Sequence, residues 1–291
     1  MRPRYRGSNI LYYYFGGSSD NYNDDNTDNN HEQPFRSQIF HHITHILRLG
    51  SISLARSLIH LTPRKPRPPW MDYYGWSQLA RFPDGGATTD AELIAPWSPT
   101  VLSFIDQTTK FSNNLASKPS YAPWTSDNTL VGVWMGVNDV GNAFYLNGWE
   151  ALITKVLGRY FEQLQIMYNA GVRKFVLLGV PPTQKTPLML ANGEASNIQL
   201  ENTISFYNNL ISTSLASFES KNSGVTSWVV DTTAPFNEAI NNPSRYGAPD
   251  ATCYNSDGKS CLWKDNYHPG IEIQKLVAAA VAKAVGQPWF A

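Results

Sequence analysis

The stretch TLVGVWMGVNDV, residues 129–140, decides the fold class of this sequence. Its first eight residues form a short apolar run, which is typical of a strand buried on both faces of a sheet. The polar residues Asn138 and Asp139 follow shortly after. Because ligands of parallel α/β sheets bind at the carboxyl ends of the strands, the stretch predicts a strand that ends at a functional site.

The segments after this stretch alternate between helix-like and strand-like patterns. Gly171 suits the end of the first helix, and Pro269 with Gly270 suits the entry to the last one. Strands separated by helices of this length predict parallel βαβ connections, and hence an α/β fold with a central parallel sheet. Apolar spacing predicts helices over 149–170, 199–221 and 271–285, and buried strands over 173–180 and 227–231.

Residues 1–69 differ from the rest of the chain. An apolar run over 10–15 predicts a first strand, and an Asn- and Asp-rich stretch with five of the six histidines follows it. His41 and His45 have i,i+4 spacing, but no carboxylate or cysteine stands at a ligand-like interval around them. We therefore interpret this part as an irregular N-terminal segment whose insertion is disordered or comes from an imperfect gene model. The main domain is expected at 70–291.

The composition argues against several classes of protein. Twenty-three basic and twenty-three acidic side chains give a formal net charge of zero, so the overall balance attracts neither nucleic acid nor an anionic membrane. No apolar stretch approaches the eighteen or so residues of a membrane span. The run over 10–15 is too short for a signal peptide and lacks a small-residue cleavage site. We expect a soluble protein with no nucleic-acid or membrane partner.

Cys253 and Cys261 are the two cysteines, and they lie close together in a predicted loop. Two sulfur ligands do not complete a zinc site, and only one histidine lies nearby. A local disulfide is therefore the preferred interpretation, and no metal site is expected. An isolated pair does not establish secretion.

Asp265 stands three residues before His268, the histidine that lies outside the N-terminal segment. Within one loop turn, a carboxylate at this spacing can accept a hydrogen bond from one imidazole nitrogen. That bond fixes the tautomer and leaves the other nitrogen free to act as a base. The alternative is a loop histidine that caps the helix beginning after Pro269.

Two further stretches carry hydrogen-bond donors. The Asn138 amide can donate to the oxygen of a tetrahedral intermediate, where each donor stabilises the developing charge. Alternatively, Asn138 and Asp139 form an Asx turn after the strand. Gly85 and Gly86 open the stretch GGATTD, in which the absence of a Cβ lets a backbone N–H approach a ligand.

A serine follows the first predicted strand. The strand runs into Phe15-Gly16-Gly17-Ser18, a tight turn that exposes the hydroxyl of Ser18. A serine in this position becomes a nucleophile when a histidine reaches it. Ser51 is a poorer candidate, because its flanking residues have a helical pattern.

Serine, glycine, asparagine, and aspartate with histidine occur here in the order that names the SGNH, or GDSL, hydrolases, and the sequence resembles this family. The resemblance is strongest to fungal acetylesterases that act on acetylated carbohydrates. The matching segments are GGATTD (85–90), VWMGVNDVGN (133–142), FEQLQIMYNAGVRKFVLLGVPPTQKTP (161–187), NNPSRYGAPDATC (241–253) and CLWKDNYHPG (261–270).

The resemblance implies a flavodoxin-like three-layer α/β/α sandwich and a serine esterase that hydrolyses short-chain acetyl esters through an acyl-enzyme. It implies an extracellular protein, and the chemistry requires neither a cofactor nor a metal. Carried over by position, the nucleophile is Ser18, the general base and acid is His268, and the carboxylate that orients it is Asp265. The oxyanion donors are Asn138 and Gly86, and Gly85 takes the place of Gly86 if the register of the two glycines shifts by one.

The sequence departs from the family pattern in its first two motifs. Gly17 stands where the family has an aspartate before the nucleophile, and residues 81–84 replace the usual Asn-x-Ala before the glycines. A second hypothesis is therefore an impaired SGNH-like fold that binds carbohydrate through Trp70, Trp97 and Trp124, although these tryptophans can equally serve in packing. A lipase or general carboxylesterase is the third.

Overall fold

The computed structural model describes residues 9–13, 71–74, 77–81 and 85–290. Within this part of the chain, six strands form a single sheet in the order β2-β3-β1-β4-β5-β6. The strands are β1 (Asn9–Tyr13), β2 (Met71–Tyr74), β3 (Ser77–Arg81), β4 (Thr129–Val133), β5 (Lys174–Leu178) and β6 (Thr226–Val230).

Five of the strands are parallel. β1 pairs with β3 on one side and β4 on the other, and β4, β5 and β6 continue the sheet in the same direction. The expected parallel sheet is confirmed, with one difference: β2 is an antiparallel edge strand paired with β3. Without β2, the spatial order corresponds to the 2-1-3-4-5 order of flavodoxin-like folds, whose ligands bind where the strand order reverses. Here that point lies between β1 and β4.

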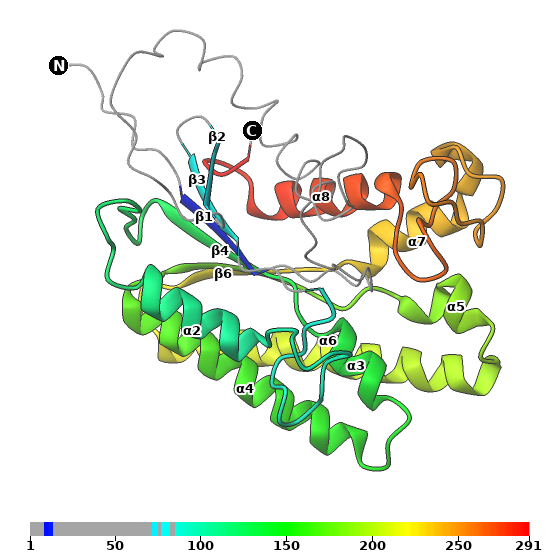
Figure 1. Ribbon diagram of the computed structural model, residues 1–291, viewed down its shortest axis with the longest axis horizontal. Coiled ribbons are helices and arrows are strands. Elements are labelled where there is room, and N and C mark those ends of the chain that lie inside the picture. The colour runs from blue at the N-terminus through cyan, green and yellow to red at the C-terminus, as the bar shows by residue number, and fades with distance from the viewer. Residues whose placement is uncertain (1–8, 14–70, 75–76, 82–84, 291) are drawn as a thin grey trace, which may run out of the picture.

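Helices cover both faces of the sheet, so the expected three layers are present. Figure 1 shows α2, α3, α4 and α6 on one face, and α7 with α8 on the other. The α-helices are α2 (Phe104–Asn114), α3 (Val137–Ala143), α4 (Trp149–Ala170), α5 (Pro187–Leu190), α6 (Glu194–Lys221), α7 (Thr233–Asn241) and α8 (Ile271–Val285), and short 3-10 turns are η2 (Thr183–Lys185) and η3 (Pro243–Tyr246).

The apolar runs form the buried strands that the sequence predicts. All five residues of β4 are buried, and so are four of the five in β5. β4 ends at Val133, three residues before the predicted end, because the chain turns toward α3 through Gly136. Helices α4 and α8 have the predicted bounds, whereas α6 begins five residues earlier than predicted.

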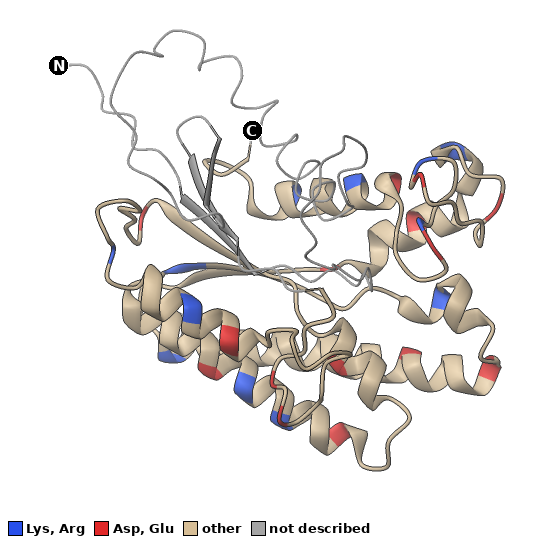
Figure 2. Ribbon diagram, in the orientation of Figure 1, with Lys and Arg blue, Asp and Glu red and all other residues tan. Residues whose placement is uncertain are grey.

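Positions of Lys and Arg are interspersed with positions of Asp and Glu along the helices (Figure 2). This distribution agrees with the zero formal net charge of the sequence. Among the described residues, no helix is both long enough and apolar enough to cross a membrane.

Candidate active site

The turn after β4 can only be built with glycine. Gly136 has φ +119°, and a Cβ at this position would lie 2.4 Å from the ring of Tyr207. The Tyr207 hydroxyl in turn donates to the carbonyl oxygen of Met135 at 3.1 Å. This close approach fixes the start of α3 and places Asn138 in its first turn, at the carboxyl end of β4.

The side chains of Asn138 and Asp139 are hydrogen-bonded to the glycine loop, which is the motif GGATTD at residues 85–90. Asn138 Nδ2 donates to the carbonyl oxygen of Ala87 at 2.8 Å. Thr89 donates to Asp139 twice, from its backbone N–H at 2.9 Å and from its hydroxyl at 3.1 Å. The hydrogen bonds of both side chains therefore reach a segment about fifty residues away, which contradicts the alternative of a local Asx turn.

Asp139 is fully buried, with an exposed fraction of 0%. Burial raises the pKa of its carboxyl to about 6, against the opposite effect of the hydrogen bonds from Thr89. The Asp139 side chain therefore joins the glycine loop to the turn after β4 without facing solvent. Asn138 keeps a second N–H on the same amide nitrogen, because Ala87 accepts only one of the two.

The backbone conformation of the glycine loop requires a glycine at position 86. This residue has φ +81°, and a Cβ there would lie 1.9 Å from the Trp97 ring. Trp97 also donates from its indole nitrogen to the carbonyl oxygen of Gly85 at 3.1 Å. Both glycines are buried beside this indole, so the backbone can pass close to it only without a side chain at Gly86.

Asp265 and His268 form a hydrogen-bonded pair in the loop before α8. His268 Nδ1 lies 2.7 Å from Asp265 Oδ2, while Asp265 Oδ1 accepts from the backbone N–H of Tyr267 and of His268. Partial burial would raise the pKa of Asp265, but the hydrogen bonds and the imidazole of His268 outweigh it and lower that pKa to about 2. Asp265 is therefore an ionised acceptor that orients the imidazole.

The other ring nitrogen of His268 is left without a hydrogen-bond partner among the described residues. Nε2 is buried, and the side chain as a whole is 18% exposed. The alternative role of capping the last helix is wrong, because α8 begins after Gly270 and has no side-chain cap. An oriented imidazole with an unpartnered buried nitrogen is the arrangement that a general base requires.

Tyr267 links the histidine loop to the elements that follow β4 and β5. A Cβ built on Gly141, three residues after Asn138 in α3, would lie 3.7 Å from the Tyr267 hydroxyl. The Tyr267 side chain is also hydrogen-bonded to Thr183, and burial raises its pKa to about 12 against the opposite effect of that bond. The loop that carries His268 therefore lies beside the helix that carries Asn138.

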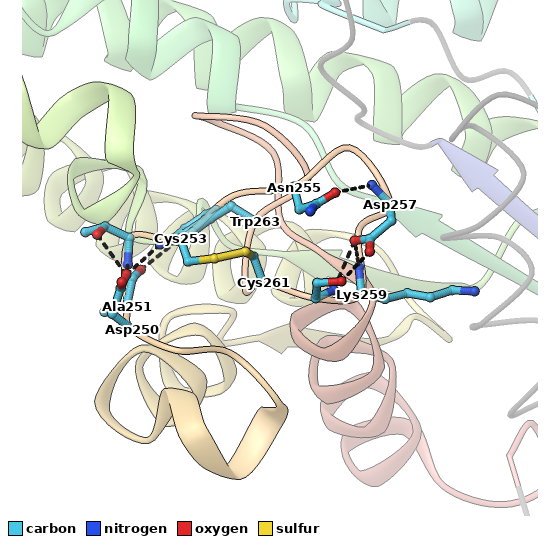
Figure 3. Close-up of a disulfide and its surroundings, with 10 residues drawn as sticks. Asp250, Ala251, Cys253, Asn255, Asp257, Lys259, Cys261 and Trp263 are labelled. Carbon is cyan, nitrogen blue, oxygen red and sulfur yellow. Dashed lines mark hydrogen bonds between the residues drawn. A yellow bond between two sulfur atoms is a disulfide. The ribbon is translucent and has the colours of Figure 1, made fainter.

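A disulfide closes the loop that precedes Asp265 (Figure 3). Cys253 and Cys261 are joined, as expected from the sequence, across a sequence separation of 8 residues. Trp263 is fully buried two residues later, and its indole donates to the carbonyl oxygen of Ala251 at 2.8 Å. The cross-linked loop is thereby attached to the residues that lead directly into the histidine loop.

The structure brings the predicted residues into two clusters joined through Tyr267. Gly85, Gly86 and Asn138 meet around Ala87, and Asp265 meets His268. Ser18 and Ser51, the two serine candidates, lie outside the described residues. So do the insertion and Trp70.

Sequence reasoning missed two residues that hold the site together, Thr89 within the first cluster and Tyr267 between the two clusters. Thr89 belongs to the motif GGATTD, and Asp139 belongs to the motif that follows β4. The hydrogen bonds between them can be expected only when both motifs are considered together. Tyr267 gave no signal apart from its place beside His268. Of the tryptophans, Trp124 is buried and donates to the carbonyl oxygen of Leu115, so it packs in the core, whereas Trp97 is exposed.

No group of three or more His, Cys, Asp or Glu residues within the described part of the chain is arranged to hold a metal ion. The site instead contains an oriented imidazole and hydrogen-bond donors at the carboxyl end of a parallel sheet. This combination defines a hydrolase of the acyl-transfer class.

The chain belongs to the GDSL-like lipase/acylhydrolase family, whose model matches residues 15–281. It is a carboxylic ester hydrolase with the SGNH-type fold. An acetylesterase from Thermothelomyces thermophilus is 55% identical over 204 residues, which cover 70% of this chain and 68% of that protein. A GDSL esterase/lipase from Arabidopsis thaliana is 28% identical over 131 residues, and that match covers 36% of the plant protein.

Solved structures agree on the fold. A mutant of an acetyl-xylooligosaccharide esterase from Geobacillus superposes with a TM-score of 0.51 at 14% identity, covering 98% of this chain and 97% of that one. An acetylxylan esterase from Geobacillus stearothermophilus gives a TM-score of 0.50 at 12% identity over the same shares. At these identities the likeness establishes the architecture alone.

Proposed function

We propose that the protein hydrolyses acetyl esters of carbohydrates through a covalent acetyl-enzyme on Ser18. The observation that carries the proposal is the state of His268: Asp265 holds one ring nitrogen at 2.7 Å, and the other is buried without a partner among the described residues. The acetyl specificity is supported by the 55% identical acetylesterase.

In the proposed mechanism, His268 Nε2 takes the proton of the Ser18 hydroxyl while Oγ attacks the ester carbonyl carbon. The oxyanion that forms accepts hydrogen bonds from the Asn138 amide and the Gly86 backbone N–H. The intermediate collapses, and His268 returns the proton to the departing sugar hydroxyl. Water then attacks the acetyl-enzyme by the same route, which releases acetate and restores Ser18.

The topology supports Ser18 as the nucleophile. Ser18 follows the end of β1 at Tyr13 by five residues, and Asn138 follows β4, the neighbouring parallel strand. Residues that follow two adjacent parallel strands leave the sheet at the same edge. The strand order reverses between these two strands, where such folds bind their ligands.

Hydrolysis of 4-nitrophenyl acetate tests the catalytic assignment. We expect Ser18→Ala and His268→Ala each to lower kcat by several orders of magnitude, because the nucleophile and the base act as a unit. Ser51→Ala is the matched control and keeps wild-type activity. Unchanged turnover in Ser18→Ala would remove this serine from the mechanism.

The alternative activity is that of a lipase or general carboxylesterase, since the family is described as GDSL-like lipase/acylhydrolase. A series of 4-nitrophenyl esters from acetate to decanoate separates them. We expect kcat/KM to fall as the acyl chain lengthens, and a maximum at eight or more carbons contradicts the acetyl preference. We also propose an extracellular location, which the Cys253–Cys261 disulfide supports.

A further inference from the structure

The peptide unit between Gly85 and Gly86 carries two polar groups that point in opposite directions. Its carbonyl oxygen belongs to Gly85, and its N–H belongs to Gly86, the proposed oxyanion donor. The peptide is trans, because the cis peptide among the described residues is Gln287–Pro288. A trans peptide is planar, so its C=O and its N–H lie in one plane and are antiparallel. A group that holds the carbonyl oxygen therefore also sets the direction of the N–H.

Trp97 holds this carbonyl oxygen. The indole Nε1 donates to the carbonyl oxygen of Gly85 at 3.1 Å. The same edge of the ring lies against Gly86, where a Cβ would be 1.9 Å from Trp97 Cδ1 and 2.1 Å from Trp97 Nε1. One side chain thus contacts both residues of the peptide unit, one through a hydrogen bond and the other through close packing.

Two adjacent glycines make the direction of this peptide easy to lose. Gly86 has φ +81°, and a glycine adopts positive and negative φ almost equally well. The peptide can therefore rotate between its two flanking Cα atoms at a low steric cost. A rotated peptide would place the carbonyl oxygen where the N–H was, and that oxygen would repel an oxyanion. The hydrogen bond from Trp97 opposes this rotation.

The same hydrogen bond also strengthens the donor. Hydrogen bonds that share a polar group polarise one another, so donation to the C=O of a peptide makes its N–H a better donor. In an oxyanion hole this polarisation acts where negative charge develops, and hence in the transition state. Trp97 can therefore influence the reaction without touching the substrate.

The loop that carries Trp97 is attached to α3, the helix of the other proposed oxyanion donor. Asn142 Nδ2 in α3 donates to the carbonyl oxygen of Ala95 at 3.3 Å, two residues before Trp97. Figure 1 shows the segment between the glycine loop and α2 beside α3. Asn138, in the first turn of α3, holds the carbonyl oxygen of Ala87. The two donors are therefore positioned by groups that are connected to each other.

Trp97 is not a core residue. Its exposed fraction is 55%, whereas Trp124 and Trp263 are buried. Burial of a large aromatic side chain is its main contribution to stability, and Trp97 is only partly buried. Its replacement should therefore affect the orientation of the peptide more than the stability of the protein, which allows the two effects to be measured separately.

We propose that Trp97 is a positioning residue for ester hydrolysis, whose indole N–H fixes and polarises the Gly85–Gly86 peptide so that the Gly86 N–H points at the oxyanion. The inference rests on the proposed function, because it requires an oxyanion that forms beside Gly86.

Two replacements of Trp97 separate the hydrogen bond from the size of the ring. Trp97→Phe keeps an aromatic ring and removes the donor. Trp97→His removes the six-membered ring but keeps a ring N–H, because the imidazole Nε2 matches the position of Nε1 in the five-membered ring of the indole. Trp228→Phe is the matched control, since Trp228 is a partly buried tryptophan in β6, at the edge of the sheet.

Hydrolysis of 4-nitrophenyl acetate is measured at pH 8, where an introduced imidazole is neutral. Loss of a whole oxyanion donor costs roughly 10²–10³-fold in kcat, so we expect misorientation in Trp97→Phe to lower kcat/KM by about tenfold. Trp97→His and Trp228→Phe should stay within about threefold of the wild-type value, because both keep the donor to Gly85.

Inhibition by phenylboronic acid distinguishes positioning from a structural defect. Its tetrahedral adduct with a nucleophilic serine places an oxygen among the oxyanion donors. The inhibition constant should therefore rise in Trp97→Phe by about the factor by which kcat/KM falls. A structural defect lowers the fraction of active protein and leaves this constant unchanged.

Three results would overturn the role of Trp97: unchanged kcat/KM in Trp97→Phe, equal losses in Trp97→Phe and Trp97→His, or a loss of activity without a change in the inhibition constant. Each of them requires an active wild-type chain, so they differ from failure of the proposed function. A wild-type chain that does not hydrolyse 4-nitrophenyl acetate overturns both. Trp97→Leu, a second variant without a donor, keeps the test valid if Trp97→Phe fails to fold.

Discussion

Thr89 donates two hydrogen bonds to the fully buried carboxylate of Asp139, and these bonds join the glycine loop to the turn after β4. Asn138, the neighbour of Asp139, holds the same loop through the Ala87 carbonyl oxygen. The two proposed oxyanion donors, Asn138 and Gly86, therefore sit on segments that are cross-linked twice. Such preorganisation lets donors stabilise an oxyanion without rearrangement during the reaction.

Thr89→Val is expected to impair both stability and turnover. The variant keeps the backbone N–H bond but leaves Asp139 Oδ2 without its hydroxyl donor, which costs about 1–3 kcal/mol in the free energy of unfolding. Displacement of the glycine loop should lower kcat on 4-nitrophenyl acetate by roughly ten- to a hundredfold. Urea unfolding and steady-state kinetics measure the two effects. Thr109→Val, on the exposed face of α2, is the control, and equal losses in both variants would contradict the argument.

Asp139 should also make stability depend on pH. Its pKa is about 6 in the folded protein against 3.8 for the ordinary side chain, so the folded state favours the protonated form. The stabilisation is complete below about pH 4 and is lost as the pH rises through 6. A difference of about 2 pKa units corresponds to on the order of 3 kcal/mol.

Asp139→Asn tests this dependence because an amide does not titrate. We expect its free energy of unfolding, relative to the wild-type protein, to rise by on the order of 3 kcal/mol between pH 4 and pH 8. Denaturant unfolding at several pH values measures the difference, in which the other titrating groups largely cancel. A difference that is constant across this range would show that Asp139 is not the titrating group.

The parallel sheet was predictable from local pattern alone. The apolar run ending at Gly136 and the helices over 149–170 and 271–285 carry strong periodicity, and the structure has them within a few residues. The antiparallel edge strand β2 was not predicted, because Met71–Tyr74 offers four residues with no clear alternation. Its position depends on pairing with β3, which is tertiary information.

The site was predictable only where its residues are close in the sequence. Asp265 and His268 are three residues apart, so their hydrogen bond follows from spacing. The bond between Asp139 and Thr89 spans fifty residues, and no local pattern encodes it. The same limit applies to Gln184 and Asn197, which line one cavity only because η2 packs on α6.

Asp265→Asn should abolish most activity while leaving the fold intact. The amide would offer an N–H to His268 Nδ1 in place of an acceptor, which favours the wrong tautomer of the imidazole. We expect kcat on 4-nitrophenyl acetate to fall by on the order of 10³–10⁴-fold. Because the pKa of Asp265 is about 2, protonation of this carboxylate does not account for a loss of wild-type activity in mild acid.

Asp257→Asn is the matched control for Asp265→Asn. Asp257 also accepts backbone N–H bonds in the same region of the chain, from Lys259 and Ser260, but it touches no proposed catalytic residue. Its kcat should remain within about twofold of the wild-type value. A comparable loss in both variants would assign the effect to the loop structure and not to the imidazole.

Removing the disulfide should destabilise the loop that supports His268. Cys253 and Cys261 close a short loop, for which the chain-entropy model gives roughly 2–3 kcal/mol. The double variant Cys253→Ala/Cys261→Ala should therefore unfold at lower temperature. We also expect a loss of kcat that exceeds its loss of substrate affinity, because the buried Trp263, which is hydrogen-bonded to Ala251, leads from the cross-linked loop into the histidine loop. Thermal unfolding with and without dithiothreitol provides the control: the reductant should lower the midpoint of the wild-type protein toward that of the double variant and leave the variant itself unchanged. Identical midpoints for all four samples would mean that the cross-link contributes nothing to the stability of this region.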